Sequence, residues 1–67
     1  MEYIAFIEFD KKKIHKNQLP GKSYTQICPM ENIDNELLGV NWLEINYGSI
    51  AKEIVMCDSF GKEIIVK

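Results

Sequence analysis

The sequence predicts a small, mainly β domain, and three observations support that prediction. Short runs rich in β-branched and aromatic residues recur along the 67 residues, turns with glycine or proline separate them, and helical periodicity is clear in one segment. We expect a small bent sheet or a partly open barrel of five to six short strands, with one short helix near residues 30–38. An α+β fold is the alternative, because residues 50–57 also fit a helical face. The whole chain, 1–67, is expected to form a single small domain.

The first strand is predicted over residues 3–9, a segment rich in β-branched and aromatic side chains. Alternate positions such as Ile7 would lie on one face, while Ile4 and Phe6 would lie on the other. Apolar side chains on both faces predict a central strand, or one covered on both sides. After a turn, a short second strand beginning near Ile14 is expected to pair back onto the first.

The predicted helix follows a turn and a short strand. Pro20 and Gly21 favour a turn, and residues 23–28 are a strand candidate that Pro29 would end. Pro29 also suits the first position of a helix, and Gly39 stands where a C-cap glycine belongs. Between them, apolar residues recur at the spacing of one helical face. These residues are Met30, Ile33, Leu37 and Leu38.

Strands are predicted for the rest of the chain. Residues 42–47 alternate between two faces, the dipeptide at 48–49 favours a hairpin loop, residues 50–57 are expected as the next strand, and residues 63–66 as the last. A tryptophan on the polar face of the strand at 42–47 would be covered by the helix or exposed as an interface anchor. The candidates for a protein interface on that face are Trp42, Glu44 and Asn46.

Composition and cysteine usage restrict the class of protein. The net charge is −2 at pH 7, and all 8 basic residues are lysine. Cys28 and Cys57 are too few for the disulfide framework of a secreted domain, so reduced thiols in a cytosolic protein are expected. The N-terminal stretch shows neither a signal-peptide pattern nor an apolar run of about 20 residues. We therefore expect a cytoplasmic protein without membrane association.

The sequence predicts neither catalysis nor a metal or cofactor. Cys28 or Cys57 could pair with His15 as nucleophile and base, yet cysteine more often packs as a small buried apolar residue. These residues and Asp58 are also scattered, whereas structural zinc sites show paired ligands at short spacing. Acidic residues in the middle of the chain fit the solvated face of a helix. They are Glu31, Asp34, Glu36 and Glu44.

A lysine cluster supports an alternative function. Residues 11–22 contain five lysines and no acidic residue, and an aromatic residue follows closely. Basic side chains beside an aromatic ring are typical of proteins that bind single-stranded nucleic acid. The negative net charge and the absence of arginine weigh against this alternative. Its candidate residues are Lys11, Lys12, Lys13, Lys16, Lys22 and Tyr24.

The expected function is that of a small non-enzymatic protein-binding module. Small β domains bind partners by presenting an edge strand or a sheet face. The abundance of isoleucine, lysine and asparagine fits an AT-rich genome, so a phage or mobile-element protein that inhibits a host protein is the role we expect. Homodimerisation is expected as well, since it would supply buried area that so short a chain lacks.

Overall fold

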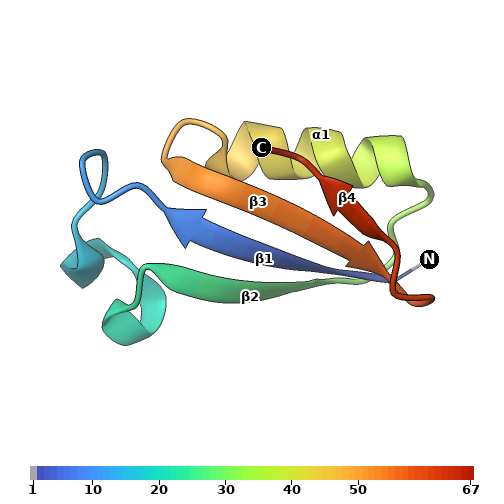
Figure 1. The fold of residues 1–67 in the computed structure, drawn as a ribbon, viewed down its shortest axis with the longest axis horizontal. Coiled ribbons are helices and arrows are strands. Elements are labelled where there is room, and N and C mark those ends of the chain that lie inside the picture. Colours follow the sequence, from blue (N-terminus) through green and yellow to red (C-terminus); the bar gives the residue numbers. More distant parts are fainter. Residues whose placement is uncertain (1) are drawn as a thin grey trace.

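The computed structural model describes residues 2–67, which form one open antiparallel sheet with an α-helix against it (Figure 1). The 4-stranded sheet has the order β2-β1-β3-β4. The mainly β prediction is confirmed. Of the two expected architectures the structure is the sheet and not the partly open barrel, and the predicted five to six strands are slightly more than the 4 observed. In chain order the elements are β1 (Tyr3–Phe9), the 3₁₀ turns η1 (Lys16–Gln18) and η2 (Pro20–Lys22), β2 (Thr25–Met30), α1 (Glu36–Tyr47), β3 (Ala51–Asp58) and β4 (Glu63–Ile65).

Strand β1 is central, as its two apolar faces predict. It pairs antiparallel with β2 on one side and with β3 on the other. Its alternate residues Ala5 and Ile7 are almost completely buried, whereas Ile4 and Phe6 between them are exposed. One face of β1 is therefore covered, and the other is not.

The helix prediction is wrong in position, because α1 spans residues 36–47 and not 30–38. Met30 ends β2, and residues 42–47, predicted as a strand, form the second half of the helix. The Oδ1 atom of Asn35 accepts a hydrogen bond from the Leu38 N–H at 3.0 Å, which caps the first turn. Leu43 lies four residues beyond Gly39, and these two residues form the buried stripe of the helix.

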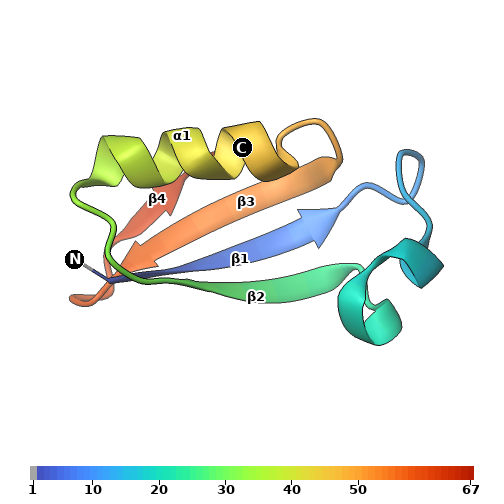
Figure 2. The same cartoon turned by 180° about the vertical axis from the view of Figure 1, so that it is seen from behind.

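The second half of the chain contains two strands rather than three. Residues 51–58 form β3, which settles the ambiguity between strand and helix in that segment. The predicted hairpin at residues 48–49 is instead the connection from α1 to β3. The strand expected near Ile14 is also absent from the structure of residues 2–67, because residues 10–24 form a loop that contains η1 and η2. This loop extends beyond the end of the sheet, away from the N-terminus (Figure 2).

The core lies between the sheet and α1. Side chains of β1 and β3 meet Leu43 there, and Leu19 adds a buried side chain from the loop. Among the described residues, no helix is both long and apolar enough to span a membrane. The residues with the least exposed surface are Ala5, Ile7, Leu43, Ala51, Ile54 and Met56.

Candidate interaction surfaces

The sheet face opposite α1 carries an apolar row that crosses all four strands. Phe6 on β1 lies opposite Ile27 on β2 and opposite Val55 on β3, and Val55 lies opposite Ile65 on β4. Ile27 is 65% exposed and Ile65 is 68% exposed. A second row beside the first is apolar on three strands, with Ile4 opposite Pro29 and Cys57, and ends at Glu63 on β4. We call the apolar residues of the two rows together the open face, which comprises Ile4, Phe6, Ile27, Pro29, Val55, Cys57 and Ile65.

The outward side of α1 is a second apolar surface. Ile45 is 84% exposed and Leu37 is 67% exposed, although a surface helix usually presents polar residues to water. With about 100° between successive residues, the exposed apolar side chains fall on the side opposite Leu43. We call this surface the outer helix face, and it comprises Leu37, Leu38, Trp42 and Ile45.

Trp42, Glu44 and Asn46 do not share one face, because they lie on a helix and not on a strand. Trp42 and Asn46 are neighbours, and the Asn46 Nδ2 donates a hydrogen bond to the Trp42 carbonyl oxygen at 2.8 Å. Glu44 is exposed about 200° around the helix from Trp42. The prediction that the three side chains form one surface is therefore wrong, since it assumed a period of two.

Trp42 borders a hollow of about 230 Å³ between α1 and β2. Its indole ring meets the Tyr47 ring edge to face, with 5.9 Å between ring centroids. The side chain is 42% exposed, so it is neither covered by the fold nor fully solvated. The other residues that line the hollow are Pro29, Met30, Glu31 and Ile33.

The outer edge of β2 is poorly suited to pairing with another strand. The Phe9 N–H bonds to the Tyr24 carbonyl oxygen at 2.8 Å, so the backbone groups of Thr25, Ile27 and Pro29 face away from β1. The Ser23 Oγ donates to the Thr25 carbonyl oxygen at 3.1 Å and accepts from the Thr25 N–H at 3.3 Å. Pro29 has no N–H to offer. These features protect the edge of β2.

The lysine cluster lies on the exposed loop that follows β1. Lys11, Lys12, Lys13, Lys16 and Lys22 are all exposed, whereas Tyr24 is half-buried. The Lys16 N–H donates to the Tyr24 hydroxyl at 3.1 Å, and the Lys11 Nζ lies 5.5 Å from the centroid of the Tyr24 ring. Tyr24 therefore helps to hold the loop, and Lys11 occupies one face of the ring that a base would need.

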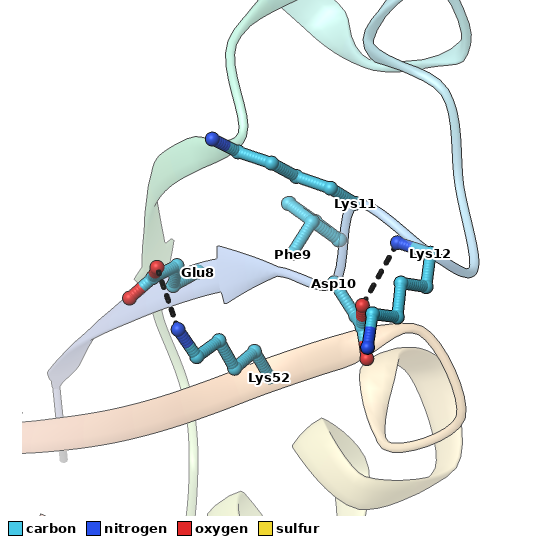
Figure 3. A pocket seen from close by; sticks show the side chains of 6 residues that line it. All are labelled: Glu8, Phe9, Asp10, Lys11, Lys12 and Lys52. Carbon is cyan, nitrogen blue, oxygen red and sulfur yellow. Dashed lines mark hydrogen bonds and ion pairs between the residues drawn. The ribbon is translucent and has the colours of Figure 1, made fainter.

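A hollow of about 370 Å³, lined mainly by charged residues, lies where this loop leaves β1 (Figure 3). Glu8 forms an ion pair with Lys52 at 3.9 Å, and the Asp10 Oδ1 accepts from the Lys12 N–H at 2.9 Å. Two carboxylates among three lysines give the hollow charges of both signs, whereas a cleft that attracts an anion is uniformly positive. The lining residues are Glu8, Phe9, Asp10, Lys11, Lys12 and Lys52.

The predicted nucleophile candidates lie apart from one another. Cys28 is opposite Ala5 on the covered side of the sheet, whereas Cys57 is opposite Ile4 on the open face. Neither cysteine forms a disulfide. His15 caps η1, where its Nδ1 accepts from the Asn17 N–H at 3.1 Å. Within residues 2–67, no three His, Cys, Asp or Glu side chains gather as metal ligands.

The four acidic residues from the middle of the chain lie around α1. Glu36 and Glu44 are exposed on the helix, and Glu31 and Asp34 are exposed in the segment before it. The Glu36 Oε1 lies 3.4 Å from the Lys62 Nζ in an ion pair exposed to solvent. These positions fit a solvated surface.

The two apolar faces are thus the best-developed surfaces of the described chain. The sequence carried a signal for each: Ile4 and Phe6 on β1, and the spacing of Leu38, Trp42 and Ile45. The second signal requires the correct helix boundaries before its periodicity becomes visible. Comparisons with known families, with curated proteins and with solved structures find no match to this chain.

Proposed function

We propose that this protein is a non-enzymatic protein-binding module that places α1 in an apolar groove of a partner protein. The observation that carries this proposal is the outer helix face. α1 buries Leu43 against the sheet while Leu37 and Ile45 project into solvent on the opposite side. A helix that is apolar on both sides is normally covered on both sides. The fold covers one of them, which leaves the other for a partner.

The spacing on the outer helix face suits recognition by a groove. Leu38, Trp42 and Ile45 stand at i, i+4 and i+7, the pattern by which a helix anchors itself in a hydrophobic groove. Trp42 is the expected anchor, because tryptophan is enriched among the residues that dominate binding energy. A side chain of the partner could enter the hollow beside Trp42 and pack against the indole ring.

The helix is also held ready for binding. Asn35 caps its first turn, and Gly39 and Leu43 pack it onto the sheet. A partner would therefore not have to order the helix, and the free energy of binding would carry no cost for folding it. A module of this kind can act simply by occupying its partner's groove. Inhibition of a host protein by a phage or mobile-element protein is the role we propose for it.

The nucleic-acid alternative has less support from the geometry. Its lysines are exposed, but Tyr24 is engaged by Lys11 and Lys16. Glu8 and Asp10 also place negative charge beside Lys11 and Lys12. Binding through this loop would therefore have to displace contacts that already exist.

Affinity capture from lysate with and without nuclease tests the proposal. The immobilised full chain is compared with Ile45→Glu on the outer helix face and with Ile27→Glu on the open face. Both isoleucines are exposed on the isolated chain, so the two variants are matched in chemistry. We expect a stoichiometric protein partner that survives nuclease, is lost with Ile45→Glu and is retained with Ile27→Glu.

Two outcomes would overturn the proposal. Equal recovery of the partner by wild type and Ile45→Glu would remove the outer helix face as the binding surface. Recovery that disappears with nuclease or with moderate salt would favour nucleic acid bound by the lysine loop.

A further inference from the structure

We propose that two copies of this chain pack through their open faces, forming a homodimer with the two sheets inside and the two helices outside. The inference goes beyond the proposed function, because it uses the opposite surface of the molecule. It leaves the outer helix face of each copy accessible to a partner protein. The two proposals can therefore fail independently.

The open face is suited to a second copy because it can pair with itself. A twofold dimer brings the same patch of both subunits together. The two rows run side by side across the sheet, so a twofold axis across the strands and midway between the rows lays each row on the other row of the second copy. Aligned packing of two sheets with apolar inner faces is a common arrangement, with about 10 Å between the sheets.

The size of the face lies at the small end of what a dimer uses. Four strands at about 4.8 Å spacing, with lengths of 7, 6, 8 and 3 residues, make a face equivalent to about 20 by 20 Å. The side chains that stand out from it raise its accessible area above this flat projection of about 400 Å². A specific interface buries roughly 600 to 1000 Å² on each partner. A chain of 67 residues with a total surface of 4676 Å² has few other places to bury that much apolar area.

Charge selects the orientation of the two copies. Glu8 lies opposite Glu53 at one end of the sheet, beyond the apolar rows. A twofold axis parallel to the strands would place these carboxylates against those of the other copy. An axis across the strands moves the two acidic ends to opposite rims, where Glu8 stays solvated beside Lys52. The geometry therefore points to the axis across the strands.

Pairing through strand edges is the competing route to a dimer, and the edges oppose it. On β2, Ser23 binds both backbone groups of Thr25, and Pro29 lacks a donor. On the other edge, β4 has only 3 residues. The sheet face offers far more surface than either edge.

Sedimentation velocity over a range of protein concentrations tests the dimer. We expect wild type and Ile45→Glu to sediment as dimers at high concentration, and Ile27→Glu to remain monomeric. Far-UV circular dichroism and thermal melting establish that both variants are folded. A folded wild type that stays monomeric up to about 1 mM, the limit of a weak complex, would overturn the proposal. So would a dimer that Ile45→Glu dissociates and Ile27→Glu does not.

Thiol reactivity gives a second readout that needs no disruptive substitution. Cys57 lies on the open face and Cys28 on the covered side. In the variant Cys28→Ser, alkylation of Cys57 should slow several-fold as protein concentration rises through the dimer range. In Cys57→Ser, the rate at Cys28 should not change with concentration. A Cys57 rate that is constant while the chain dimerises would show that the interface lies elsewhere.

Discussion

Gly39 on α1 lies directly against Met56 on β3. A Cβ atom added at Gly39 would stand 2.9 Å from the Met56 Sδ and 3.3 Å from its Cε. Met56 has no exposed surface, so it can make room for added volume only by turning the flexible end of its side chain. The glycine therefore sets how closely the helix approaches the sheet.

Enlarging this residue should weaken the fold in proportion to the volume added. Gly39→Ala should be close to neutral, because the end of Met56 can shift and alanine favours the helix by about 1 kcal/mol. Gly39→Val adds two further methyl groups, and we expect it to lower the free energy of unfolding by about 1 to 3 kcal/mol. Urea denaturation measures both variants.

Asn41→Val provides the control for Gly39→Val. Asn41 is exposed on the same helix, and asparagine and valine have similar helix propensities. Its free energy of unfolding should change by less than about 0.5 kcal/mol. Equal effects at positions 39 and 41 would mean that the contact with Met56 does not limit the approach of the helix.

The N-cap of α1 gives a second prediction. The Asn35 Oδ1 accepts from the Leu38 N–H at 3.0 Å. Asn35→Ala should lower the free energy of unfolding by about 1 kcal/mol, because an N–H of the first turn loses its acceptor. Asn35→Asp should retain stability, since its carboxylate can accept the same hydrogen bond and favours the helix N-terminus. If alanine and aspartate were equivalent in thermal denaturation, the cap would not contribute.

The contact of Gly39 with Met56 and the packing of Leu43 explain why the helix was misplaced from sequence. Gly39 resembles a C-cap because glycine so often follows the last turn of a helix. Here it is needed for a close approach to Met56, which the sequence places 17 positions further on. Residues 42–47 alternate as a strand would, yet the packing of Leu43 against the sheet favours the helix.

Other parts of the fold and site were accessible from sequence. The central position of β1 follows from its two apolar faces, and the strand at 51–58 from its β-branched residues. For Trp42 the sequence left open whether the side chain is covered by the helix or exposed as an anchor, and the residue is 42% exposed. Its grouping with Glu44 failed because a period of two was applied to residues that form a helix. For the same reason, the outer helix face was not predicted from the sequence.

The Tyr47 hydroxyl gives a prediction about pH. Burial, followed by the neighbouring Cys28 side chain, raises the pKa of Tyr47 above its usual 10.0. The folded chain therefore holds this proton more tightly than the unfolded chain. The stability that Tyr47 contributes should be complete below pH 10.0 and decline as the pH rises through the folded pKa. Tyr47→Phe should reduce this decline in urea denaturation between neutral and alkaline pH.

The two cysteines provide a matched test of the cause. Following the Tyr47 ring by NMR against pH, we expect Cys28→Ala to lower the Tyr47 pKa toward its usual value. Cys57→Ala should leave that pKa unchanged, because Cys57 lies on the opposite side of the sheet. A Tyr47 titration that is insensitive to both substitutions would assign the whole shift to burial.

The protected edge of β2 gives the last prediction. Ser23 binds both edge-facing groups of Thr25, and Pro29 removes a donor at the other end of the strand. The double variant Ser23→Ala, Pro29→Val should restore a continuous edge of hydrogen-bonding groups from Thr25 to residue 29. Because Ile27 lies at the centre of that edge, we expect aggregation that rises with concentration and binds thioflavin T. Each single variant keeps one protecting feature and should aggregate less. A double variant that stays as soluble as wild type would show that Ser23 and Pro29 are not what prevents aggregation through the edge of β2. Sedimentation would then test whether a dimer through the open face protects this edge by covering the Ile27 side chain.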